Sequence, residues 1–263
     1  MESAFSKREI YPSPNQSFSF YLETIESVKN DALIILDANV LLLPFTTDVK
    51  NVEAIKCVYQ RLVKSDQIFL PAQSVREYLD NRAKKLTDIN EALQKKSNQC
   101  FNFVGGHPLL EGLEQYQSVI ELETELKESI KAYQNKIRAT LSAVQAWGGW
   151  NDPVSKMYHE VLSERVLCDK DLDMDEISKD LKRRNLLKIP PGYKDQSKDQ
   201  NQAGDLLIWN EILRLALKKQ QHVIFVSVDE KVDWWHQSGK KPLYPRFELV
   251  DEFREKTSGK SFH

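Results

Sequence analysis

The sequence predicts an α/β fold built on a parallel sheet. Segments with helical periodicity separate three short apolar runs that have the length of buried strands. The three runs are Ala32–Leu36, Gln67–Leu70 and Val223–Val228. Continuous apolar runs are typical of strands that are covered on both faces. Strands that alternate with helices are usually joined as parallel neighbours. We therefore expect one parallel sheet with helices packed against it.

The first run ends at Asp37, and Asp48 is a suitable N-cap for a helix that continues to Lys64. The second run is stopped by Pro71, and a long helical pattern begins at Gln73. A loop at residues 101–108 separates this pattern from a second long stripe of apolar residues that reaches Val144. Two such helices predict an antiparallel helical hairpin inserted at about residues 85–150.

The remaining chain completes the α/β pattern. A helix is expected to begin at Gly204-Asp205 and continue to Lys219, before the third strand. We then expect a short helix that contains Trp234 and Trp235, and a final helix around Phe247–Phe253. Residues 1–30 are polar and aromatic and are expected to form an N-terminal lead-in arm, and residues 31–263 to form one domain that carries the hairpin.

Composition limits the class of protein. The chain has 263 residues, and its 37 Lys and Arg nearly balance 39 Asp and Glu, so a site for a polyanion must be a local patch. The cysteines, Cys57, Cys100 and Cys168, have no metal-binding spacing and are expected to be buried or idle thiols. The sequence shows no secretory signal and no apolar run long enough for a bilayer. We expect a cytoplasmic protein with no membrane contact.

Four acidic residues are expected to share one crevice. Asp37 and Asp229 directly follow strands, Glu77 follows the second strand closely, and Asp205 stands in the first turn of a helix. In open parallel sheets, ligand sites lie beyond the carboxyl ends of the strands. Each acid taken alone is explained equally well as a turn residue, a helix cap or a partner of a surface Lys or Arg.

A cluster of four carboxylates needs a cation, because the like charges otherwise repel one another. Oxygen ligands without His or Cys suit Mg²⁺ or Mn²⁺. Two such ions would activate water and stabilise the departing oxygen in phosphodiester hydrolysis. We therefore assign catalysis and metal binding to Asp37, Glu77, Asp205 and Asp229, and expect two ions.

The residues around these acids resemble those of PIN-domain nucleases. Leu36-Asp37-Ala38-Asn39-Val40-Leu41 resembles the family's first strand and its D-x-N-V-L continuation, and Phe225–Asp229 its late strand ending in T-x-D, with Ser227 in the place of the commoner Thr. Residues 190–195, followed by Gly204-Asp205 and Asp233-Trp234-Trp235, resemble a bacterial PIN-like subfamily with a long helical insertion. The resemblance implies a three-layer sandwich and metal-dependent endonuclease activity on RNA or DNA, with RNA favoured.

Other residues are expected to support this site. Asn39 and Ser227 can orient Asp37 or a metal-bound water. Asp195 is kept outside the group of four. The densest basic stretch leads toward Asp205 and suits phosphate contact, although a solvated helix face explains it nearly as well: Arg183, Arg184, Lys188, Lys194 and Lys198. Trp234 and Trp235 suit either base stacking or the core, and at least one is expected in the core.

Three alternatives remain open. The chain could act on DNA instead of RNA, because no base-reading motif is present. It could be a catalytically silent PIN-like protein that binds or scaffolds a partner. A phosphohydrolase of the haloacid dehalogenase kind is disfavoured, because those enzymes show D-x-D where this chain has Asp37-Ala38-Asn39. The resemblance also suggests a role in defence or as a toxin, and a homo-oligomer or a regulatory protein partner held through the hairpin.

Overall fold

The computed structural model describes residues 5–18, 21–197 and 199–263. The chain divides into two compact units, the first formed by Met1–Asp80 with Met157–His263 and the second by Asn81–Lys156. The predicted lead-in arm belongs to the first unit, and its residues 1–4, 19 and 20 lie outside the described part. In that arm, α1 covers Ser6–Ile10, η1 covers Pro14–Gln16 and α2 covers Ile25–Val28.

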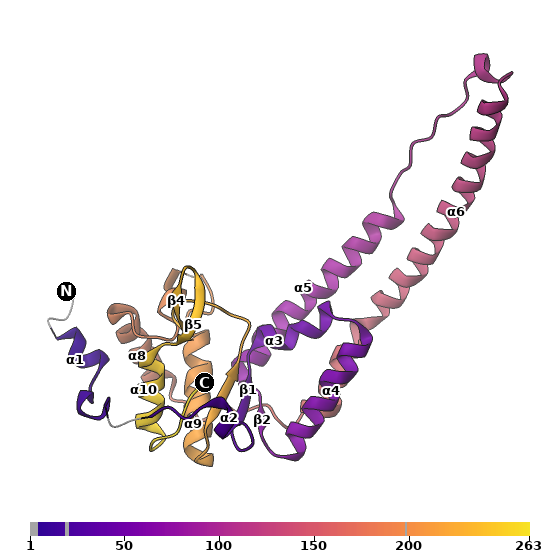
Figure 1. Cartoon of the computed structure of the whole chain (residues 1–263). Helices are drawn as coiled ribbons and strands as arrows, with labels where there is room; N and C mark the ends of the chain where they lie inside the picture. Colours follow the sequence, from indigo (N-terminus) through magenta and orange to yellow (C-terminus); the bar gives the residue numbers. More distant parts are fainter. Residues whose placement is uncertain (1–4, 19–20, 198) are drawn as a thin grey trace. The chain divides into compact units, whose positions relative to one another are not determined.

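A parallel sheet of three strands organises the first unit (Figure 1). β1 (Leu33–Leu36) lies between β2 (Ile68–Phe69) and β3 (Val223–Val226), and both pairings are parallel. Isolated parallel bridges continue the sheet at each edge, where Leu70 pairs with Val166 and Val223 pairs with Phe262. The prediction of an α/β fold with a central parallel sheet is confirmed.

Helices place the ends of these strands. α3 (Ala38–Leu42) begins immediately after Asp37, so the chain turns at the carboxyl end of β1. α4 (Val49–Lys64) has the predicted cap, because Asp48 Oδ1 accepts from Asn51 N at 2.9 Å. α9 (Gly204–Lys219) is the central core helix, and Trp209 on it is fully buried. The other helices of this unit are η2 (Leu43–Thr46), α8 (Met174–Leu187), η5 (Tyr193–Ser197) and α10 (Phe247–Lys256).

The second unit contains two long helices that run in opposite directions. α5 (Ala72–Ser97) starts in the first unit and continues into the second, and α6 covers Glu114–Gln145. The segment between them runs beside α6 toward the N-terminal end of that helix. Gln134 Nε2 donates to Gln99 O at 3.0 Å, and Val104 N donates to Glu123 Oε1 at 2.6 Å. The connection therefore covers residues 98–113, which is longer than the predicted loop. η3 (Pro108–Leu110), η4 (Ala146–Gly149) and the first residues of α7 (Pro153–Leu162) complete the unit.

The short helix predicted around Trp234 and Trp235 is wrong. Trp234 ends a turn, and β4 (Trp235–Ser238) pairs antiparallel with β5 (Lys241–Pro245). Gly239 and Lys240 have φ values of +57° and +66°, which are those of a tight hairpin turn. Trp234 is buried and packs on Phe225, with ring centroids 4.9 Å apart, so one of the two tryptophans belongs to the core as expected.

Candidate active site

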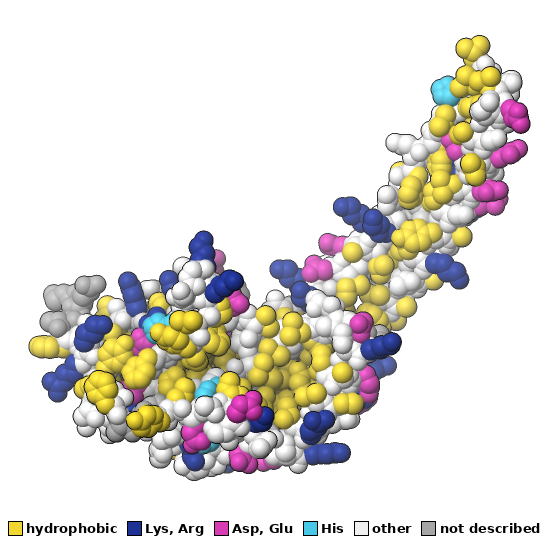
Figure 2. Space-filling model, in the orientation of Figure 1, with side chains coloured by type: hydrophobic (Ala, Val, Ile, Leu, Met, Phe, Trp, Pro, Cys, Tyr) yellow, Lys and Arg dark blue, Asp and Glu magenta, His cyan; other side chains and the backbone are white. Residues whose placement is uncertain are grey.

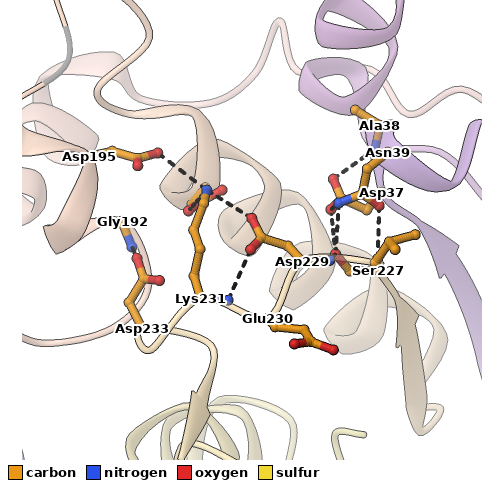
Figure 3. A network of polar contacts seen from close by, with 12 residues as sticks. Asp37, Ala38, Asn39, Gly192, Asp195, Ser227, Asp229, Glu230, Lys231 and Asp233 are labelled. Carbon is orange, nitrogen blue, oxygen red and sulfur yellow. Dashed lines mark hydrogen bonds and ion pairs between the residues drawn. The ribbon is translucent and has the colours of Figure 1, made fainter. Parts of the chain in front are cut away.

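Asp37 stands at the carboxyl end of β1 and is held by three donors (Figure 3). Its Oδ1 accepts from Ala38 N at 2.7 Å, and its Oδ2 accepts from Ser227 Oγ at 2.6 Å and from Asn39 Nδ2 at 2.8 Å. Burial raises the pKa of Asp37, and the charges of Glu77 and Asp229 add to this effect, whereas the bonds from Ser227 and Ala38 oppose it. The carboxylate is therefore fixed in orientation and lies within the field of two other acids.

Asn39 and Ser227 join the ends of β1 and β3. Asn39 Nδ2 also donates to Ser227 Oγ at 3.1 Å, and Asn39 Oδ1 accepts from Val228 N at 2.9 Å. Ser227 Oγ accepts from Asp229 N at 2.9 Å while it donates to Asp37. The two side chains thus tie Asp37 to the backbone that carries Asp229, as expected of residues that orient a functional carboxylate.

Lys231 connects the acids that follow β3 and precede α9. Its Nζ lies 3.0 Å from Asp229 Oδ2, 3.5 Å from Asp205 Oδ2 and 3.8 Å from Asp195 Oδ2. Its backbone N–H also donates to Asp229 Oδ1 at 2.9 Å. Burial opposes the charge of Lys231, but Asp205, Asp229 and Asp195 outweigh it and raise the pKa of the ammonium. Lys231 therefore remains a cation inside this acidic cluster.

Asp205 is the most strongly perturbed acid of the predicted four. Burial raises its pKa to about 7, and Asp195 and Asp233 add to the rise while Lys231 opposes it. Asp233 is fully buried; its Oδ2 accepts from Gly192 N at 3.1 Å, and its Oδ1 has no hydrogen-bond partner among the described residues. Gly192 has φ +91°, and a Cβ there would lie 3.7 Å from Asp205 Cβ, so the loop passes close beside this carboxylate.

Glu77 lies near the start of α5 and is held by two side-chain amides. Its Oε1 accepts from Gln73 Nε2 at 3.0 Å and from Asn201 Nδ2 at 2.7 Å. A Cβ on Gly204 would lie 2.7 Å from Glu77 Oε1, so a larger residue at the start of α9 would displace the Glu77 carboxylate. Glu77 therefore faces the start of α9 and reaches Asp37 through its charge.

The structure brings the four predicted acids to one edge of the sheet, but in an uneven grouping. Asp37 is bonded to Ser227 and Asn39, Asp229 and Asp205 share Lys231, and Glu77 binds amides at the side of the cluster. Asp195, which the sequence interpretation kept apart, is buried and lies with Asp205 and Asp229 around Lys231. Lys231 itself was missed, although a lysine two residues after a strand-end acid is a usable signal.

The basic residues predicted to contact phosphate separate into buried and exposed groups. Arg184 is only 1% exposed, with its Nε 2.6 Å from Asp180 Oδ2 and its Nη2 2.7 Å from Glu252 Oε1, and it also donates to Pro190 O. It supports the loop at residues 190–195 and is not placed to meet a polymer. Arg183, Lys188 and Lys194 are exposed, and Lys198 lies outside the described residues.

One hollow in the described chain does not coincide with the four predicted acids. It has a volume of about 540 Å³ and is lined by residues of α8, α9 and α10 with the turn before α8, and none of the four predicted acids lines it. The acids instead occupy the strand-end edge, where chemistry is expected in this type of sheet. The candidate site is therefore the group of carboxylates at this edge, and not the hollow.

The donor chemistry at this edge fits a hard divalent cation. The candidate ligands at this edge are Asp and Glu carboxylates. Burial raises the pKa of Asp37 and of Asp205, so their charged forms need a nearby positive charge. As the side chains stand, however, no three His, Cys, Asp or Glu residues within the described ranges converge on one ion position. Lys231 supplies part of the positive charge there.

The fold and the site define an α/β protein with a cluster of acidic residues at the carboxyl edge of its parallel sheet. A family model described as a PIN like domain matches residues 33–249, so the chain belongs to the PIN-like domain family, which is of nuclease type. No curated protein and no solved structure matches the chain. No helix in the described ranges has the length and apolar character needed to cross a membrane.

Proposed function

We propose that this protein is a metal-dependent endonuclease that hydrolyses phosphodiester bonds, with RNA as the favoured substrate. One observation carries the proposal: Asp37, Asp205 and Asp229 come from separate elements and meet at the carboxyl edge of the sheet, with Glu77 close enough to act on Asp37 through its charge. Membership of the PIN-like family supports the same reaction class.

Two Mg²⁺ or Mn²⁺ ions would be held by Asp37, Glu77, Asp205 and Asp229. When bound, the metal supplies Lewis-acid chemistry and a nucleophile at neutral pH. Ser227 and Asn39 keep the carboxylate of Asp37 in one orientation through bonds of 2.6 Å and 2.8 Å to its Oδ2. Lys231, whose side chain is 34% exposed, holds Asp205 and Asp229 together and presents positive charge to an incoming phosphate.

The exposed basic residues Arg183, Lys188 and Lys194, with Lys198, are proposed to contact the polymer backbone, and Arg184 is excluded by its burial. We further propose that the enzyme works in the cytoplasm in a defence or toxin role. Cys57, Cys100 and Cys168 are exposed free thiols, which supports a reducing compartment; of the two expected states, buried or idle, the buried one is wrong.

The test is cleavage of end-labelled RNA, single-stranded DNA and duplex DNA by the full chain, with Mn²⁺ and with chelator. We expect internal cuts in RNA that require the metal. Cleavage of DNA and not of RNA would show that this protein is a DNA nuclease. The parent could cut no polymer and still have a melting temperature that rises with Mn²⁺. If the melting temperature of Asp205→Asn does not rise, the protein binds the cation without cleaving nucleic acid.

A further inference from the structure

Lys231 differs from the lysines of the outer surface in what surrounds its charge. Lys and Arg side chains are dispersed over the face of the molecule that Figure 2 shows, with acidic side chains among them. The ammonium of this lysine instead lies among carboxylates from three segments, 3.0 Å from Asp229 Oδ2, 3.5 Å from Asp205 Oδ2 and 3.8 Å from Asp195 Oδ2 (Figure 3). We call this place the ammonium position. Three acidic side chains already face one cation there.

The charges at the ammonium position do not balance. Three carboxylates surround one ammonium, and the fully buried Asp233 acts through its charge on Asp205 as well. Asp233 Oδ1 has no hydrogen-bond partner among the described residues, although its Oδ2 accepts from Gly192 N at 3.1 Å. A buried carboxylate oxygen without a donor is costly unless positive charge is near it. The excess negative charge therefore suits a divalent cation.

Asp195 is fixed at this position by the fold of its loop. It lies in η5, is 4% exposed, and its backbone N donates to Gly192 O at 3.0 Å. Other segments hold the same loop, because Asp233 accepts from Gly192 N and Arg184 donates to Pro190 O. Asp195 Oδ2 is 3.8 Å from the ammonium, which is too far for a hydrogen bond. Its carboxylate therefore contributes negative charge to the position and not a hydrogen bond to the lysine.

The side chain of Lys231 can leave while its backbone stays in place. Its backbone N–H donates to Asp229 Oδ1 at 2.9 Å, whereas its side chain is 34% exposed and reaches solvent. Mg²⁺ takes oxygen ligands at about 2.0–2.1 Å, and all three carboxylate oxygens lie farther than this from the ammonium nitrogen. A divalent ion and the ammonium also repel each other at such short range. The two cations therefore compete for the position.

We propose that the ammonium position is one of the two cation positions of the site, and that Asp195 is a ligand there together with Asp205 and Asp229. The charges of Glu77 and Asp229 act on Asp37, and these three acids form the other position. The ammonium is displaced when the second ion binds. The assignment rests on the proposed metal-dependent function, to which it adds a fifth acidic ligand and an order of binding.

The first test measures whether a metal ion releases the ammonium. The full chain is treated with an acetylating succinimidyl ester, and the acetylation rate of each lysine is followed by peptide mass spectrometry. Mg²⁺ is expected to raise the rate at Lys231 by roughly fivefold or more, because the displaced amine leaves the carboxylates and reaches solvent. Lys241, which is exposed on β5, is the internal control and should not respond. A rate at Lys231 that Mg²⁺ lowers or leaves unchanged overturns the proposal.

The second test concerns Asp195. In calorimetry, the parent is expected to bind a first Mn²⁺ and, at least about tenfold more weakly, a second. Asp195→Asn should weaken the second ion by roughly tenfold or more, leave the first unchanged and remove the response of Lys231 to Mg²⁺. Asp199→Asn is the matched control, because Asp199 is exposed on the same segment. If Asp195→Asn lowers the melting temperature in chelator but keeps both metal responses of the parent, Asp195 is structural and the proposal is wrong.

Failure of this proposal is distinguishable from failure of the proposed function. A parent that binds no Mn²⁺ in calorimetry would contradict the metal-dependent function and, with it, the second cation position. A parent that binds two ions, with no metal-linked change in the acetylation of Lys231 and no effect of Asp195→Asn on either ion, would keep the proposed function and reject the ammonium position as a metal site.

Discussion

Asparagine at position 205 is expected to make the protein more stable at alkaline pH. The side chain of Asp205 is only 13% exposed, and burial raises its pKa to about 7 from 3.8. A group of this kind binds its proton more tightly in the folded state, so folding is favoured below pH 4 and loses that contribution as pH rises through about 7. Asn keeps the shape and carries no charge at any pH.

The magnitude follows from the two pKa values. A rise from 3.8 to about 7 corresponds to at most about 4 kcal/mol in the free energy of unfolding. Loss of the contact with Lys231 subtracts from this gain, because Asp205 partly compensates the ammonium. We expect Asp205→Asn to be more stable than the parent by roughly 2 kcal/mol at pH 8 and by much less at pH 5.

Urea unfolding in chelator at both pH values measures this difference. Asp66→Asn is a matched control, because Asp66 is 59% exposed and its pKa is lowered through its contacts with Lys219 and Arg165. That variant should lose less than about 1 kcal/mol, equally at pH 5 and pH 8. The reasoning is refuted if Asp205→Asn is no more stable than the parent at pH 8, or if its gain is the same at both pH values.

Further predictions concern three other residues. Lys231→Met should strengthen Mn²⁺ binding by roughly tenfold or more in calorimetry, because a competing cation leaves the carboxylates; unchanged or weaker binding would show that the lysine does not compete. Glu211 accepts from the first backbone N–H groups of α5, the shorter bond being 2.7 Å, so Glu211→Ala should cost about 2 kcal/mol in urea unfolding and Glu211→Gln less. Equal losses would exclude this capping role. Ser227→Ala should lower the cleavage rate by roughly tenfold while Ser227→Thr retains it, because the hydroxyl holds Asp37; full activity in the Ala variant would contradict that role.

The backbone frame of the site follows from local patterns. The buried run before Asp37 and the run before Asp229 are apolar without interruption, and Asp205 opens a helix whose apolar residues are continuous. Parallel connection of such strands brings their carboxyl ends together whatever the side chains do. Positions of Asp37, Asp205 and Asp229 at one edge were therefore predictable.

The side-chain contacts across the site were not predictable in the same way. Lys231 reaches Asp205 and Asp195 from the segment just before the turn that precedes β4, where the sequence predicts a short helix instead. Arg184 looked like one member of a basic run, but Glu252, 68 residues away in sequence, pairs with it in the interior. Both outcomes depend on contacts between distant segments, which periodicity and spacing do not encode.

Metal-dependent cleavage by Asp37→Asn tests the central claim most directly. Asn preserves the size of the side chain and removes the charge at the end of β1, and circular dichroism establishes that the variant is folded. With Mn²⁺, the parent is predicted to cut labelled RNA internally, and Asp37→Asn to lose at least about a hundredfold in rate. Equal cleavage by the two proteins, or cleavage by the parent that persists in chelator, would contradict the assignment of this acidic edge as a metal-dependent nuclease site.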